Sequence, residues 1–74
     1  MDLDQLERRL EAATGAPWEQ HRTWLWTDAA PVAVEVVGDT AWVGSNPWDD
    51  RGPTIPPMRA TTEADVIALV CRWW

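Results

Sequence analysis

A chain of 74 residues with one cysteine, Cys71, cannot be held together by an intrachain disulfide. A domain this short buries only about 60% of the surface that its unfolded chain exposes, so its stability is marginal unless something reinforces the core. The sequence offers seven Trp and neither Phe nor Tyr, and each buried Trp removes roughly 150–250 Å² from water. We therefore expect one small domain over residues 1–74 whose core depends on tryptophan, with dimerisation as a second source of stability.

The charge balance limits the kinds of partner. Six Arg, no Lys and 12 acidic residues give a net charge of −6. Neutralising nucleic-acid phosphates or gripping anionic lipid needs clustered basic residues, so we expect no direct nucleic-acid binding and no membrane association. A negative protein does suit a partner with a basic surface. The N-terminal segment is charged and lacks the apolar run of a signal peptide, and the cysteine is unpaired, which together indicate the cytoplasm.

Two segments have the periodicity of a helix. Residues 2–14 begin at Asp2, a good N-cap, and stop at Gly15, and apolar residues recur between these limits at helical spacing. Residues 62–74 begin at Thr62 in the same way and carry a broad apolar face. The residues of that second face are Val66, Ile67, Leu69, Val70, Trp73 and Trp74.

The middle of the chain has the residue types and turn signals of strands. Residues 21–27, 32–37 and 40–44 are rich in Val, Thr and Trp, and a two-residue Gly-Asp turn joins the last two. Residues 44–60 hold four of the six Pro and predict a long packed loop. The predicted fold is therefore α+β: a helix, a three-stranded antiparallel sheet, a Pro/Gly-rich loop and a C-terminal helix, with both helices on one face of the sheet.

The direction of the tryptophans in the sheet depends on strand register. The two-residue turn places Trp42 beside Glu35 on the face away from the helices. Trp24 and Trp26 share one face of the first strand and Leu25 points to the other. A one-residue slip moves the whole set across the sheet, so two registers remain. Large aromatic residues dominate small cores, and we expect Trp24 and Trp26 to be core residues. In the alternative register they join Trp42 in an outer patch.

The sequence contains no convincing catalytic or metal-binding pattern. His21 and Cys71 could in principle form a nucleophile pair, but a cysteine among apolar helix residues behaves as a small hydrophobe. Asp49 and Asp50 are adjacent acids in a Pro/Gly-rich loop, where such residues form turns, and the alternating spacing of a calcium loop is absent. We therefore expect no enzyme activity, no bound metal and no cofactor.

What remains is a role in binding. The leading hypothesis is a small acidic protein-interaction module, an inhibitor or adaptor of the kind that phages encode, which contacts a protein partner through exposed Trp and carboxylates. Two alternatives stay open: a nucleic-acid mimic that inhibits a DNA- or RNA-binding protein, and a homo-oligomeric component of a larger assembly. The candidate partner-binding residues are Trp24, Trp26, Trp42, Glu35, Trp48, Asp49 and Asp50.

Overall fold

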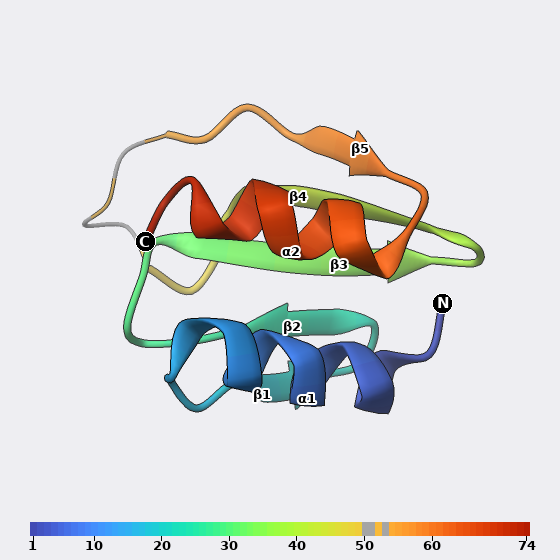
Figure 1. Ribbon diagram of the computed structural model, residues 1–74. Helices are drawn as coiled ribbons and strands as arrows, with labels where there is room; N and C mark the ends of the chain where they lie inside the picture. Colours follow the sequence, from blue (N-terminus) through green and yellow to red (C-terminus); the bar gives the residue numbers. More distant parts are fainter. Residues whose placement is uncertain (50–51, 53) are drawn as a thin grey trace.

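The computed structural model describes residues 1–49, 52 and 54–74. Over these residues the chain forms two helices and a five-stranded antiparallel sheet (Figure 1). Strands that are neighbours in sequence are also neighbours in the sheet, whose order is β1-β2-β3-β4-β5. The predicted α+β class is confirmed, but the sheet has five strands where three were expected. The elements are α1 (Leu3–Thr14), β1 (Glu19–His21), β2 (Trp24–Trp26), β3 (Val32–Val37), β4 (Thr40–Ser45), β5 (Met58–Ala60) and α2 (Glu63–Cys71).

The prediction of one strand over residues 21–27 is wrong, because the chain reverses inside it. His21 ends β1 and pairs with Trp24 at the start of β2, so that a two-residue turn lies between them. Arg22 in that turn has a φ of 57°, in the left-handed region that favours glycine. Because the turn contains no Gly, Asn or Asp, the sequence lacks the usual hairpin signal there.

The second additional strand lies in the segment predicted as a loop. β5 pairs with β4 at the edge of the sheet, and Arg59 stands opposite Trp42. Two prolines, Pro56 and Pro57, come directly before β5. Proline is compatible with the approach to an edge strand, because one side of such a strand needs no ladder partner. Three residues are also too few to display an alternating pattern.

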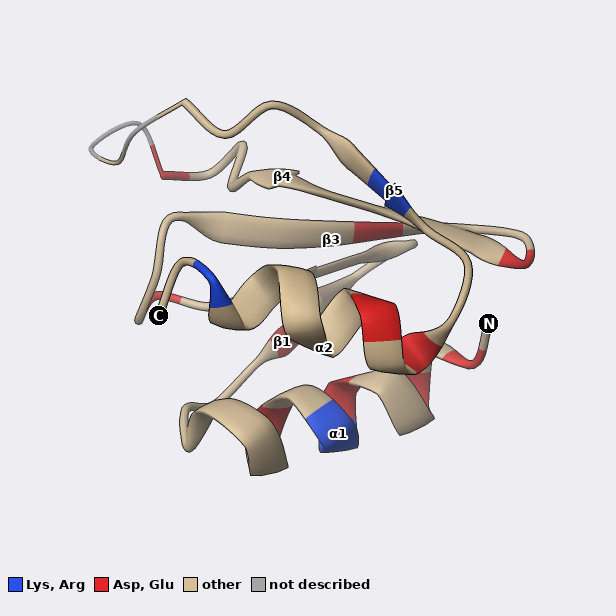
Figure 2. Cartoon of the chain, turned by 45° about the horizontal axis from the view of Figure 1, so that its top comes forward, with Lys and Arg blue, Asp and Glu red and all other residues tan. Residues whose placement is uncertain are grey.

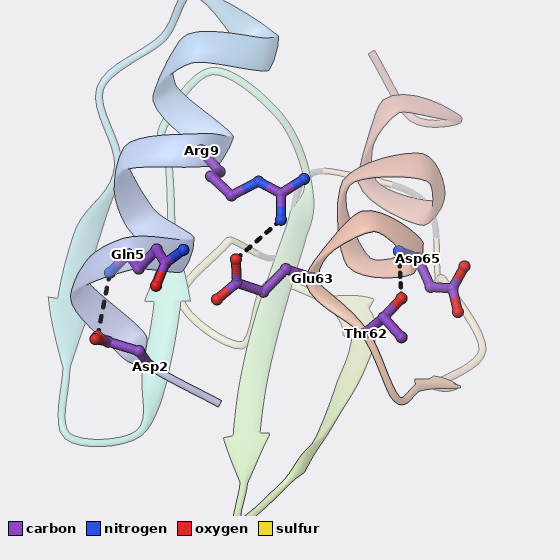
Figure 3. Close-up of polar contacts among 6 residues, drawn as sticks. All are labelled: Asp2, Gln5, Arg9, Thr62, Glu63 and Asp65. Atoms are coloured by element: carbon purple, nitrogen blue, oxygen red, sulfur yellow. Dashed lines mark hydrogen bonds and ion pairs between the residues drawn. The ribbon is translucent and has the colours of Figure 1, made fainter.

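The predicted helix caps are confirmed. The Asp2 carboxylate accepts a hydrogen bond from the Gln5 backbone N–H at 3.2 Å, and the Thr62 hydroxyl accepts one from the Asp65 N–H at 3.1 Å (Figure 3). Gly15, with a φ of 71°, closes α1. The second helix ends earlier than predicted, at Cys71, whose side chain is exposed and not embedded in an apolar face.

Both helices cover the same face of the sheet, as predicted (Figure 1). α1 lies over the β1–β2 side and α2 over β3, β4 and β5. An ion pair of 2.9 Å between Arg9 and Glu63 joins the two helices (Figure 3). In the part of the chain that the structure describes, neither helix is long and apolar enough to cross a bilayer. Fully buried core side chains include Leu6, Leu10, Leu25, Val34, Val43, Val66 and Val70.

The register between strands decides where the tryptophans lie. In the β3–β4 hairpin, Glu35 pairs with Trp42, as the two-residue turn predicted. Between β2 and β3, Leu25 pairs with Val34 and Trp24 with Glu35. Leu25 therefore enters the core, while Trp24 and Trp26 lie on the outer face with Trp42. The expectation that Trp24 and Trp26 are core residues is wrong, and the alternative register holds.

This register gives two valines of β3 very different exposure to solvent. Val34 is fully buried and Val37 is 52% exposed on the opposite face. Replacing Val34→Ala removes two buried methyl groups and leaves a cavity, which should lower the free energy of unfolding by about 2 kcal/mol. The matched Val37→Ala change should lower it by less than about 0.5 kcal/mol. Urea denaturation of both variants measures the difference, and equal losses would contradict the register.

Candidate functional site

A row of directly opposed residues crosses all five strands on the face away from the helices. Its members, in strand order, are His21, Trp24, Glu35, Trp42 and Arg59. Neighbouring strands lie about 4.8 Å apart. Trp24 and Trp42 are two strands apart, so their backbones are separated by about 10 Å with Glu35 between them. We call this set the outer-face row.

Besides Trp24, Trp26 and Trp42, the outer face carries a fourth indole, Trp48. It comes from the loop after β4 and packs against the His21 end of the row. The Trp48 ring lies 5.5 Å from the His21 ring and 5.8 Å from the Trp24 ring, measured between centroids, and meets both edge to face. It also lies 5.7 Å from the Trp26 ring at a tilt of 36°. Edge-to-face pairs are worth about 0.5–1.5 kcal/mol beyond the area that they bury. His21, Trp24, Trp26 and Trp48 thus form one aromatic cluster.

The position of Trp48 is set by a buried asparagine. Asn46 is only 3% exposed, and its backbone N–H donates to the Pro31 carbonyl at 2.9 Å. Its side-chain oxygen accepts from the Trp48 backbone N–H at 2.9 Å, and its side-chain nitrogen donates to the Thr27 carbonyl at 3.4 Å. Both ends of the amide are therefore used to hold the loop against the β2–β3 connection, which places the Trp48 indole over β2.

An open groove of about 530 Å³ lies between the two tryptophans of the outer-face row. The segment before β5 closes one side of it. The Ser45 hydroxyl accepts a hydrogen bond from the Ile55 backbone N–H at 2.7 Å and donates one to the Ile55 carbonyl oxygen at 3.3 Å. A methyl group on Gly44 would lie only 3.4 Å from the Pro57 Cα, so the segment runs close to β4. The residues that line the groove are Trp24, Glu35, Trp42, Gly44, Ser45, Ile55 and Pro57.

Glu35 is the one charged residue among the described ones that line the groove. It is the single charged residue of the fully described strands β2, β3 and β4. In Figure 2 the red of β3 is Glu35 and the blue of β5 is Arg59, whereas the other acids that the structure describes lie on or beside the helices, on β1 and in the turns and loops. Among the described residues, the one ion pair is that of Arg9 with Glu63. Glu35 is partly buried beside indoles, and no basic side chain among the described residues forms an ion pair with its carboxylate.

Most of the predicted site residues come together. Trp24, Trp26, Trp42, Glu35 and Trp48 share the outer face, either in the row or in the aromatic cluster. The remaining two predictions concern the acids of the loop. Asp49 follows Trp48, and its backbone N–H donates to the Asn46 carbonyl at 3.1 Å. Asp50 lies outside the described residues. Over the described ranges no three His, Cys, Asp or Glu side chains gather as a metal site would require.

Other tryptophans do not belong to this face. Trp18 is 4% exposed and its ring nitrogen donates to the Thr14 hydroxyl at 3.1 Å. Its ring stacks against that of Trp74 at 6.1 Å. Trp18 is therefore a core residue whose ring nitrogen is satisfied within the fold, and it offers no exposed contact to a partner.

Sequence reasoning missed several members of the site. Asn46, Ile55 and Pro57 come from a segment without periodicity, so no pattern marks which of its residues return to the sheet. The place of His21 beside Trp48 depends on the β1–β2 turn, which has no sequence signal of its own. The one available signal is Asn46 two residues before Trp48 in a turn-rich loop. Asn side chains commonly form hydrogen bonds with the backbone two residues on, and such a bond would fix the position of Trp48.

The role of Asn46 can be tested on its own. Asn46→Ala removes the acceptor for Trp48 and the donor for Thr27 in a buried position, so the free energy of unfolding should fall by about 1–3 kcal/mol. The near-ultraviolet circular dichroism that arises from packed indoles should weaken at the same time. Gln20→Ala, which removes an exposed side-chain bond to Asp4, should change stability by less than about 0.5 kcal/mol. A native spectrum for Asn46→Ala would contradict this assignment.

The chain was compared with models of protein families, with curated proteins and with solved structures. Nothing matched in any of the three comparisons.

Proposed function

We propose that this protein is a small interaction module that acts in the cytoplasm and binds a protein partner on the outer face of its sheet. The observation that supports this best is the groove between Trp24 and Trp42, with the Glu35 carboxylate inside it. The partner contributes a segment that enters the groove and covers the exposed indoles. Inhibitors and adaptors act by binding alone, and a single groove that takes a partner segment is sufficient for such a role.

The exposure of the indoles supports a binding role. Trp42 is 40% exposed and Trp48 is 48% exposed on the same side of the molecule. Leaving large aromatic surfaces in water forgoes stabilisation that the fold could otherwise gain. Tryptophan is enriched among the residues that carry most of the energy of protein–protein binding. Neighbouring exposed indoles on a small domain are therefore typical of an interface.

The groove is also built on rigid elements. Trp24, Glu35 and Trp42 project from paired strands, and Trp24 is further held by the Trp48 ring. A site held in its binding geometry loses less conformational entropy when a partner docks. The net charge of −6 adds long-range attraction for a partner with a basic surface.

Peptide display on the immobilised protein tests this proposal. We expect selected peptides to bind Trp42→Ala and Trp24→Ala at least about tenfold more weakly than the original protein, because hot-spot residues contribute 2 kcal/mol or more. Trp74→Ala is the matched control, since Trp74 is 48% exposed and stacks on Trp18 instead; its affinity should be unchanged. Circular dichroism confirms that each variant is folded.

Two results would overturn the proposal. One is a selection that enriches no peptide, and the other is a set of peptides that bind the Trp24 and Trp42 variants as well as the original protein. Sedimentation at micromolar concentration addresses the alternative of a homo-oligomeric component: a dimer that Trp42→Ala dissociates would assign the outer face to self-association. A nucleic-acid mimic would instead bind a DNA- or RNA-binding protein with an affinity that falls steeply with salt.

A further inference from the structure

Any partner segment that covers the groove also buries the negative charge of Glu35, which then needs a compensating positive charge. The carboxylate is already partly buried between Trp24 and Trp42, and no described residue neutralises it. Covering it with an apolar segment would strip away its remaining water and leave an unpaired buried charge, which is strongly unfavourable. A complementary occupant therefore brings a positive charge to this point of the groove.

The chain's own nearest cation in the outer-face row does not supply that charge. Arg59 stands at the end of the row on β5, and Trp42 separates it from Glu35. Arg59 is exposed and makes no ion pair with Glu35. Over residues 1–49, 52 and 54–74, no basic side chain pairs with the Glu35 carboxylate, and a cation from a partner can take that place.

The walls of the groove favour one kind of cation. Indole faces attract cations, and a guanidinium group is planar, weakly hydrated and able to stack on them. It also presents two parallel N–H donors that match the two oxygens of a carboxylate. The groove that Trp24, Glu35 and Trp42 line has room for such a planar group. A lysine ammonium is more strongly hydrated and has no flat face to stack.

We propose that the groove takes an arginine side chain of the partner, whose guanidinium pairs with Glu35 between Trp24 and Trp42. The proposal rests on the proposed function and specifies the chemistry of the partner. The aliphatic part of the arginine lies along Pro57, which is exposed and lines the groove, as the stems of long charged side chains commonly do on apolar surfaces. The volume of about 530 Å³ leaves space for the residues that flank this arginine.

A pair of short peptides that differ in charge alone tests this inference. The probes are acetyl-Gly-Gly-Arg-Gly-Gly-amide and the same peptide with citrulline, a neutral planar analogue of arginine, followed by nuclear magnetic resonance of the indole N–H groups. The arginine peptide should shift the Trp24 and Trp42 signals saturably. The dissociation constant of the citrulline peptide should be at least about tenfold higher, because the charge-assisted pair is lost.

Variants of two acids provide the matched comparison on the protein side. Glu35→Gln keeps the shape of the side chain and should weaken the arginine peptide by about tenfold or more. Glu63→Gln removes an equal charge at the helices, where Glu63 pairs with Arg9, and should leave the affinity within about twofold, which is the long-range electrostatic share.

The outcomes separate this inference from the proposed function. Equal affinity for arginine and citrulline, unchanged binding by Glu35→Gln, or no binding of the arginine peptide at millimolar concentration would overturn the arginine assignment. Tighter binding of the corresponding trimethyllysine peptide would also overturn it, in favour of a quaternary ammonium. In each case, display-selected peptides without arginine that lose affinity for Trp42→Ala would leave the proposed function standing.

Discussion

The alignment of β2 with β3 decides which side chains fill the core and which stay outside it. Leu25 opposite Val34 directs Leu25 toward the helices, and the same alignment turns Trp24 and Trp26 to the other face. A shift by one residue would exchange the two sets completely, because strand side chains alternate. The groove, the aromatic cluster and the place of Glu35 between two indoles all depend on this alignment.

The core that results is mainly aliphatic. Leu and Val side chains from both helices and the central strands fill it. Trp18, at 4% exposed, is the one fully described tryptophan that is buried. The expectation that tryptophan reinforces the core holds for Trp18 and for the partly buried Trp73, which packs against the core. The four tryptophans of the outer face instead lie outside the core: Trp24 and Trp42 line the groove, and Trp26 and Trp48 pack beside Trp24 in the aromatic cluster. Their exposed area is surface that a partner can cover.

The predictable part of the structure is the part with strong local signals. Asp2 and Thr62 cap the helices, and the Gly38-Asp39 turn sets Trp42 opposite Glu35. The remainder lacked such signals. The β1–β2 reversal uses Arg22 in a conformation usually given to glycine, and β5 is too short to alternate. The direction of Trp24 was a choice between two registers that only the tertiary packing of Leu25 could settle.

The most direct measurement of this account is the set of nuclear Overhauser contacts made by the tryptophan rings. With ring centroids 5.7–5.8 Å apart, protons of Trp48 should give contacts to both Trp24 and Trp26. Neither Trp24 nor Trp26 should give contacts to the methyl groups of Val66 and Val70, which are buried on the inner side of α2. Contacts from these two indoles to those methyl groups would place them in the core and contradict the account.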